Sequence, residues 1–114
     1  SLPHLAGKID GMAVRVPTLN VSLVAFQGLL QKDTSVEAIH QAFRQASATE
    51  RAGILEINDL PLVSCDFNHQ SASCIVDSAQ TRLLKRQAKM MAWYDNEWGF
   101  SNRLLDVLGY WQTL

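Results

Sequence analysis

The sequence is poor in glycine, and its few glycines do not form a phosphate-binding loop. Six glycines occur in 114 residues, and none of their spacings gives G-x-G-x-x-G or G-x-x-x-x-G-K. Those two patterns let the backbone approach the phosphates of a dinucleotide or a nucleoside triphosphate. We therefore do not expect the chain to bind a dinucleotide through a Rossmann fold of its own.

Cysteines, charge of one sign and long apolar runs are also scarce. Two cysteines are too few for a disulfide scaffold, so we expect a reduced, cytoplasmic protein. The net charge is −1, and the only basic cluster (Lys85, Arg86 and Lys89) is too small to predict nucleic-acid or membrane binding. No apolar run approaches the length that crosses a bilayer. With 47% apolar and 18% charged residues, the chain is typical of one globular domain.

The order of the apolar patterns predicts an α+β fold. Alternation and short apolar runs predict strands at residues 12–16, 21–30, 54–57, 63–67, 74–77 and 88–92. A capping box of Thr34 and Glu37 opens a helix that should end near Ala48. Residues 81–87 are expected to form a polar connection. Because helices are few and do not alternate with strands, we predict a mixed or antiparallel sheet with helices on one face.

The stretch from Trp93 to Arg103 joins a predicted buried strand to a predicted helix, and it is rich in polar groups. Apolar residues then recur on one helical face, at Phe100, Leu104, Leu105, Leu108 and Trp111. Asp95 and Asn96 are both suitable helix N-caps, because a short side-chain oxygen accepts backbone N–H groups of the first turn. One cap would suffice, so the extra polar groups between two core elements indicate a surface against which another group docks.

The spacing of cysteine and histidine gives little support for chemistry on these residues. Cys65, His69 and Cys74 form C-x3-H-x4-C, which lacks a fourth ligand and matches no zinc pattern, so we predict no metal site. A nucleophilic cysteine would need an orienting group and an oxyanion hole. Cys65 is expected to face inward from its strand, and the adjacent Asp66 would then point to the opposite side. We predict no catalytic residue in this chain.

Arg15 is the only charged residue in the first predicted strand pair, and two interpretations of it remain open. A strand arginine commonly lays its aliphatic part along apolar surface and leaves its charge in solvent. Alternatively, Arg15 clamps an anion, because the rigid fork of guanidinium donors matches a phosphate group.

Asn96 also has two interpretations. It is a good helix cap on spacing alone. A side-chain carboxamide, however, donates and accepts hydrogen bonds at once, so it can pair with another carboxamide, such as that of a nicotinamide ring. Holding that group would fix which face of the ring meets a substrate.

Residues 93–103, Trp-Tyr-Asp-Asn-Glu-Trp-Gly-Phe-Ser-Asn-Arg, resemble the C-terminal signature of the phosphorylating glyceraldehyde-3-phosphate dehydrogenases and the related erythrose-4-phosphate dehydrogenases. The likeness extends over nearly the whole chain. Ala-Val-Arg-Val-Pro-Thr at 13–18 and Asn-Val-Ser at 20–22 are similar to the segment that follows the inter-subunit loop of these enzymes. The resemblance implies that residues 1–114 are the C-terminal portion of a catalytic domain, without the NAD-binding Rossmann domain and the catalytic cysteine segment.

The resemblance assigns ligands to two residues. Arg15 matches the arginine that lines the anion site for inorganic phosphate or the substrate phosphate, and Asn96 matches the asparagine that contacts the nicotinamide carboxamide. In the intact enzyme, a homotetramer, a cysteine thiolate would attack a phosphorylated sugar aldehyde, hydride would pass to NAD, and phosphate or water would release the thioester. Neither Cys65 nor Cys74 stands at the position of that cysteine, so the fragment alone is not expected to be active.

Several details favour the erythrose-4-phosphate branch. Segments 60–69 and 75–82 are similar to that branch, Phe100 stands where the glyceraldehyde-3-phosphate enzymes usually have tyrosine, and Leu19 stands where they usually have proline. The branch oxidises erythrose 4-phosphate to 4-phosphoerythronate for pyridoxal phosphate synthesis. A glyceraldehyde-3-phosphate dehydrogenase is the alternative within the family, and a catalytically inert interaction module is the alternative from another class.

Overall fold

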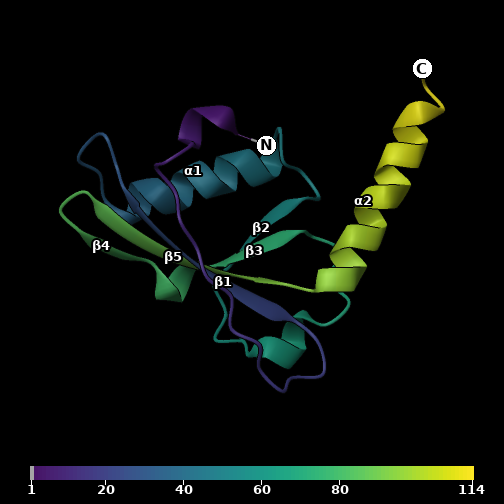
Figure 1. Ribbon diagram of the computed structural model, residues 1–114, viewed down its shortest axis with the longest axis horizontal. Coiled ribbons are helices and arrows are strands. Elements are labelled where there is room, and N and C mark those ends of the chain that lie inside the picture. Colours follow the sequence, from purple (N-terminus) through teal and green to yellow (C-terminus); the bar gives the residue numbers. More distant parts are fainter. Residues whose placement is uncertain (1) are drawn as a thin grey trace.

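The computed structural model describes residues 2–114, which form a mixed sheet with two helices (Figure 1). The strands are β1 (Ser22–Leu29), β2 (Leu55–Asn58), β3 (Cys74–Asp77), β4 (Arg82–Leu84) and β5 (Gln87–Tyr94). The helices are α1 (Val36–Ala48) and α2 (Asn96–Trp111), and short 3-10 helices cover Pro3–Leu5, Ser64–Phe67 and Ser78–Gln80. The predicted α+β class is confirmed.

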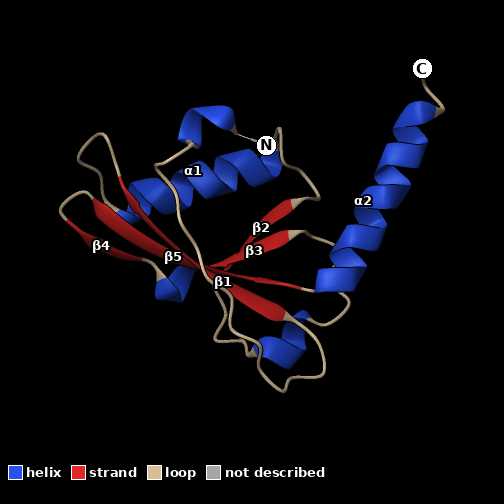
Figure 2. Cartoon of the chain, viewed as in Figure 1, coloured by secondary structure: helices blue, strands red, loops and turns tan. Residues whose placement is uncertain are grey.

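β5 pairs with three other strands, more than any other strand of the sheet (Figure 2). One edge is antiparallel to β1 over its full length, with Ser22 opposite Tyr94 and Leu29 opposite Gln87. The other edge pairs first with β4 and then with β3, both antiparallel, and β2 lies parallel to β3. Since β5 ends beside the beginning of β1, the residues that follow β5 lie next to those that precede β1.

α1 packs against β2 and covers one face of the sheet (Figure 1). The helix begins after Ser35, whose hydroxyl accepts a 3.1 Å hydrogen bond from the amide of Ala38. The predicted cap, Thr34, is therefore wrong by one residue. Farther along, His40 Nε2 lies 2.9 Å from the hydroxyl of the buried Thr81, which fastens α1 to the segment before β4.

The apolar core is small and lies around β3 and β5. The buried apolar residues are Val21, Phe67, Ala72, Ile75, Val76, Ala88 and Ala92. Phe67 stacks on Trp93 near the end of β5, with ring centroids 5.5 Å apart. Aromatic pairs at such distances contribute about 0.5–1.5 kcal/mol beyond the burial of their area. A cluster of buried apolar residues therefore supports the point where β5 leads into α2.

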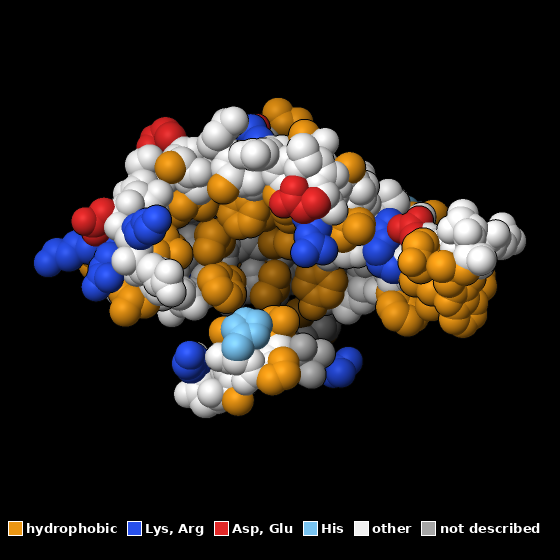
Figure 3. All heavy atoms as spheres, turned by 90° about the horizontal axis from the view of Figure 1, so that it is seen from above, with side chains coloured by type: hydrophobic (Ala, Val, Ile, Leu, Met, Phe, Trp, Pro, Cys, Tyr) orange, Lys and Arg blue, Asp and Glu red, His pale blue; other side chains and the backbone are white. Residues whose placement is uncertain are grey.

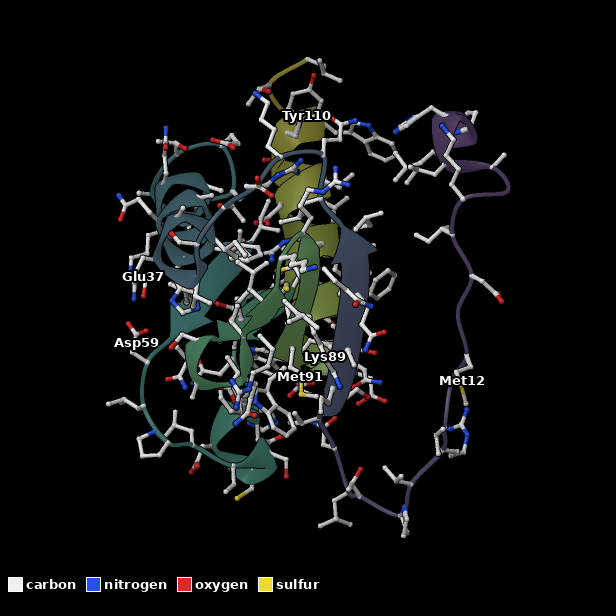
Figure 4. The ribbon with its side chains drawn as sticks, turned by 90° about the vertical axis from the view of Figure 1, so that its left-hand side faces the viewer. Met12, Glu37, Asp59, Lys89, Met91 and Tyr110 are labelled. Carbon is white, nitrogen blue, oxygen red and sulfur yellow. The ribbon has the colours of Figure 1, made fainter. Side chains whose placement is uncertain are left out.

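The strand predicted at residues 12–16 does not form. The segment pairs with no strand of the described residues, and Met12 and Val14 are exposed. Figure 4 shows Met12 on a segment that stands apart from the sheet. Alternation identifies which residues would share a face, but it does not supply a hydrogen-bonding partner, and Pro17 has no N–H to offer a ladder.

The strand predicted at residues 63–67 is a 3-10 helix instead, Ser64–Phe67. The Asp66 carboxylate accepts a 2.8 Å hydrogen bond from the amide of Val63, and the Asp66 amide donates to the Val63 carbonyl at 3.0 Å, which closes a turn. Phe67 is buried, whereas Val63 and Cys65 are exposed. The prediction that Cys65 faces inward is wrong.

The polar connection predicted at residues 81–87 contains a strand. β4 and β5 form a hairpin whose turn consists of Lys85 and Arg86, and Lys85 has a positive φ of 54°. Two-residue hairpin turns usually place glycine, asparagine or aspartate at positive φ, so Lys-Arg carries no turn signal in the sequence.

α2 projects from the sheet (Figures 1 and 2), and its apolar side is exposed. The helix is confirmed, but the expectation that it is a core element is wrong within the described residues. At least half of the surface of each residue in the predicted stripe is exposed, namely Phe100, Leu104, Leu105, Leu108 and Trp111. Figure 3 shows apolar side chains gathered along this helix. Helical spacing shows that these residues share a side of the helix, but not what covers it.

Candidate functional site

The corner between β5 and α2 is fixed by the carboxylate of Asp95, which is only 2% exposed. Its Oδ1 accepts a 3.0 Å hydrogen bond from the amide of Trp98, which caps α2. Its Oδ2 accepts two further bonds of 2.8 Å, from the amide of His69 and the side-chain nitrogen of Asn20. One side chain therefore joins the start of α2, the loop before β3 and the segment before β1.

The charge on Asp95 is stabilised by these donors. Burial alone would raise the pKa of Asp95, but the backbone hydrogen bonds from Trp98 and His69, together with the Asn20 side chain, outweigh burial and lower the pKa below its ordinary value. A carboxylate in this position also suits the positive end of the α2 dipole. The corner is thus a charged, hydrogen-bonded and rigid anchor at neutral pH.

Asn96, the first residue of α2, is exposed beside this anchor. Its Oδ1 accepts a 2.8 Å hydrogen bond from the hydroxyl of Ser22, the first residue of β1. The β1–β5 register brings the two residues together, because Ser22 lies opposite Tyr94. Asn96 Nδ2 donates to no acceptor among the described residues, so its two N–H groups remain available at the surface.

Arg15 lies apart from this corner, in the unpaired segment before β1. It is exposed, and no hydrogen bond or ion pair joins it to another of residues 2–114. The structure therefore does not bring Arg15 and Asn96 into contact. The bond between Asn20 and Asp95 anchors the end of the segment that carries Arg15, but its anion-binding role stays a prediction.

The first turn of α2 docks closely on the loop before β3. Gly99 is buried, and a Cβ atom on it would lie 3.2 Å from the carbonyl oxygen of Ala72. One turn later, the guanidinium of Arg103 donates hydrogen bonds of 3.1 Å to the carbonyl of Ser71 and to the hydroxyl of Ser73. These contacts set the direction in which α2 leaves the sheet, and with it the position of Asn96.

The cysteines are not arranged as a reactive centre or a metal site. No group of three or more His, Cys, Asp or Glu side chains that could hold a metal ion occurs within residues 2–114. Cys65 and Cys74 are free thiols, and burial raises the pKa of Cys74 above its ordinary value. A raised pKa opposes formation of the nucleophilic thiolate.

Neither helix of the described chain is long and apolar enough to span a membrane.

Three supports of the corner, Asn20, Ser22 and His69, carry no local signal in the sequence. The partners of Asp95 lie 75 and 26 positions away from it, and Ser22 lies 74 positions from Asn96. The cap itself is visible in the sequence, where Asp95 precedes a helical pattern. Only the register of the two predicted strands at 21–30 and 88–92 could have placed Ser22 beside Asn96.

The class of protein follows from comparison with known families. The family model described as glyceraldehyde 3-phosphate dehydrogenase, C-terminal domain, matches residues 1–96 of this chain. The chain therefore belongs to the glyceraldehyde-3-phosphate dehydrogenase family. The mixed sheet with two helices is consistent with that domain, and the resemblance carried by residues 93–103 is confirmed at the level of the family.

Individual relatives are similar over almost the entire chain. The glyceraldehyde-3-phosphate dehydrogenase of Pseudomonas aeruginosa is 53% identical over 105 residues, which cover 92% of this chain and 31% of that protein. The chromosomal enzyme of Cupriavidus necator is 50% identical, covering 93% and 32%, and glyceraldehyde-3-phosphate dehydrogenase 2 of Bacillus subtilis is 44% identical, covering 94% and 32%. The chain spans about a third of the length of these relatives.

Proposed function

We propose that this chain is the C-terminal part of the catalytic domain of an NAD-dependent dehydrogenase that oxidises a phosphorylated sugar aldehyde, with glyceraldehyde 3-phosphate as its substrate. The observation that carries the proposal is the exposed amide of Asn96, fixed at the corner between β5 and α2. The names of the relatives support this substrate. The dinucleotide-binding domain and the catalytic cysteine of the proposed cytoplasmic enzyme lie outside this chain.

Asn96 is the proposed contact of the cofactor. NAD supplies the hydride acceptor of the oxidation. The fit rests on a surface amide with available N–H donors, complementary to the nicotinamide carboxamide, and on a backbone that Asp95 holds in place. Because rates depend steeply on the alignment of the reacting groups, a contact on a fixed helix start orients the ring better than one on a mobile loop.

Arg15 is the proposed contact of the anion, either inorganic phosphate or the phosphate of the aldehyde. Its guanidinium is exposed, and no carboxylate of residues 2–114 lies within ion-pairing distance. A guanidinium that no neighbouring carboxylate neutralises is suited to bind a phosphate through paired hydrogen bonds.

A homotetramer is the proposed state of the intact enzyme. Large apolar residues are exposed on β1, where Leu23, Val24 and Phe26 are 44–49% exposed, as well as along α2. Monomeric proteins rarely expose contiguous apolar patches of more than a few hundred Å². These surfaces therefore support the proposal that other parts of the enzyme or other subunits cover them.

Erythrose 4-phosphate is the second candidate substrate, favoured by Leu19 and Phe100. Both residues are exposed, and Phe100 is 64% exposed at the beginning of α2. They therefore lie where other parts of an intact enzyme can contact them. The product would then be 4-phosphoerythronate, a precursor for pyridoxal phosphate.

The proposal is tested by NADH formation with the purified full-length protein. Glyceraldehyde 3-phosphate and erythrose 4-phosphate are compared side by side, each with and without inorganic phosphate. We expect the higher kcat/KM with glyceraldehyde 3-phosphate and a requirement for phosphate, because phosphate releases the thioester as an acyl phosphate. Preference for erythrose 4-phosphate without that requirement would establish the second candidate. No NADH from either substrate would reject the dehydrogenase and favour an inert interaction module.

A further inference from the structure

The amide of Asn96 is turned with its oxygen toward the hydroxyl of Ser22. A carboxamide has an accepting oxygen at one end and a donating nitrogen at the other, and a half turn of the side chain exchanges the two. In this structure Asn96 Oδ1 faces Ser22 Oγ at 2.8 Å, so the nitrogen is the end that remains available.

The rest of Asn96 is held by its neighbours. The carboxylate of Asp95 accepts the amide of Trp98 at 3.0 Å and the amide of His69 at 2.8 Å, so the backbone at the start of α2 has little freedom. Ser22 belongs to β1, which is paired with β5 along its whole length. The hydroxyl that contacts Asn96 therefore belongs to a strand and not to a loop. Its hydrogen bond restricts rotation of the Asn96 side chain.

We propose that Ser22 is a positioning residue for the cofactor. By occupying Oδ1 of Asn96 it presents N–H donors to the ligand, so that Asn96 contacts the carbonyl oxygen of the nicotinamide carboxamide and not its amine. This inference rests on the proposed cofactor role of Asn96. It assigns Ser22 an effect on ring orientation although Ser22 itself touches neither the substrate nor the reacting atoms.

The test measures binding without turnover, in the full-length protein. Ser22→Thr keeps the hydroxyl. Valine has nearly the same shape as threonine but lacks the hydroxyl, so comparing Ser22→Val with Ser22→Thr isolates the hydrogen bond. The dissociation constant is measured by titration for three ligands: NAD, 3-acetylpyridine adenine dinucleotide, which has the carbonyl but no amine, and ADP-ribose, which lacks the ring. Asn96→Ala is measured in parallel.

Ser22→Val is expected to weaken NAD about threefold to tenfold relative to Ser22→Thr, the effect of one lost neutral hydrogen bond. The acetylpyridine analogue should weaken at least as much, and the affinity for ADP-ribose should stay unchanged. An equal loss for ADP-ribose would show a general structural effect and overturn the proposal. A loss for NAD alone would identify the amine as the contacted group and would also overturn it.

The Asn96→Ala variant distinguishes failure of the positioning role of Ser22 from failure of the proposed cofactor contact of Asn96. If Asn96→Ala weakens NAD but Ser22→Val and Ser22→Thr bind it equally, the cofactor role of Asn96 stands and the positioning role of Ser22 is wrong. If neither Asn96→Ala nor Ser22→Val changes NAD binding, both the cofactor contact and the positioning role are overturned.

Discussion

The side-chain nitrogen of Asn20 donates a 2.8 Å hydrogen bond to the carboxylate of Asp95, although 75 positions separate the two residues in the sequence. The same nitrogen donates to the side-chain oxygen of Asn68 at 2.7 Å. Asn20 precedes β1, Asn68 lies in the loop before β3, and Asp95 follows β5. The corner that presents Asn96 is therefore assembled by the folding of the whole sheet.

Replacing Asp95 with alanine is expected to lower the free energy of unfolding by about 2–4 kcal/mol. The change removes a helix cap and leaves the partly buried amide hydrogen bonds of His69 and Trp98 without their acceptor. Urea-induced unfolding measures the loss. Asp106→Ala is the matched control, because it removes only the exposed pair with Arg103, worth less than about 1 kcal/mol. Equal losses of unfolding free energy in the two variants would contradict the claim that Asp95 anchors the corner.

The stability that Asp95 contributes is expected to depend on pH. Because its pKa is lower in the folded protein than its ordinary value, the folded state remains charged where the unfolded chain takes up a proton. The contribution is complete above about pH 4, the ordinary pKa of aspartate, and is lost as the pH falls through the lower folded pKa. The difference in unfolding free energy between the wild type and Asp95→Asn should therefore narrow only below about pH 4. A difference that is constant with pH would show that the folded pKa is not lowered.

Two glycines of α2 are expected to respond to alanine in opposite directions. Gly99→Ala places a methyl group 3.2 Å from the carbonyl oxygen of Ala72, and crowding of this kind costs about 1–3 kcal/mol. Gly109→Ala meets nothing within 4 Å, so the better helix propensity of alanine should stabilise it by up to about 1 kcal/mol. The thermal unfolding temperatures of the two variants test this difference. A Gly99→Ala protein as stable as Gly109→Ala would show that the loop around Ala72 shifts at no cost in stability.

Trp93→Phe is expected to destabilise the fold more than Trp98→Phe does. Trp93 Nε1 donates a 3.2 Å hydrogen bond to the buried carboxylate of Asp77, and removing a donor from a buried carboxylate costs about 1–3 kcal/mol. Trp98 is 45% exposed, and its indole nitrogen donates to no acceptor among the described residues. Unfolding free energies of the two variants provide the measurement. A larger loss for Trp98→Phe would contradict the importance of the bond to Asp77.

Much of the fold could be predicted from periodicity and caps, because these are local properties. The runs at 21–30, 74–77 and 88–92 form β1, β3 and β5, and the helical stripe after Asp95 forms α2. Two of the predicted strands do not form. At residues 12–16 an alternating pattern has no partner strand, and at 63–67 the carboxylate of Asp66 closes a turn in place of a strand.

The site could be predicted only in part. Asp95 and Asn96 stand out because cap chemistry is visible within a few residues. Asn20, Ser22 and His69 could not be found, because their contacts depend on strand register and loop closure over 26–75 positions. The periodicity of α2 likewise does not predict which surface covers its apolar side.

The most direct test of the account is one kinetic comparison of Arg15→Ala and Asn96→Ala in the full-length protein, with NAD and the phosphorylated aldehyde varied in turn. We expect Arg15→Ala to lower kcat/KM for the aldehyde or for phosphate by about tenfold or more, through loss of a charge-assisted hydrogen bond, with KM for NAD unchanged. Asn96→Ala should instead raise KM for NAD or lower kcat, with the phosphate dependence unchanged. Wild-type kinetics in both variants would contradict the claim that this domain contacts the anion through Arg15 and the cofactor through Asn96.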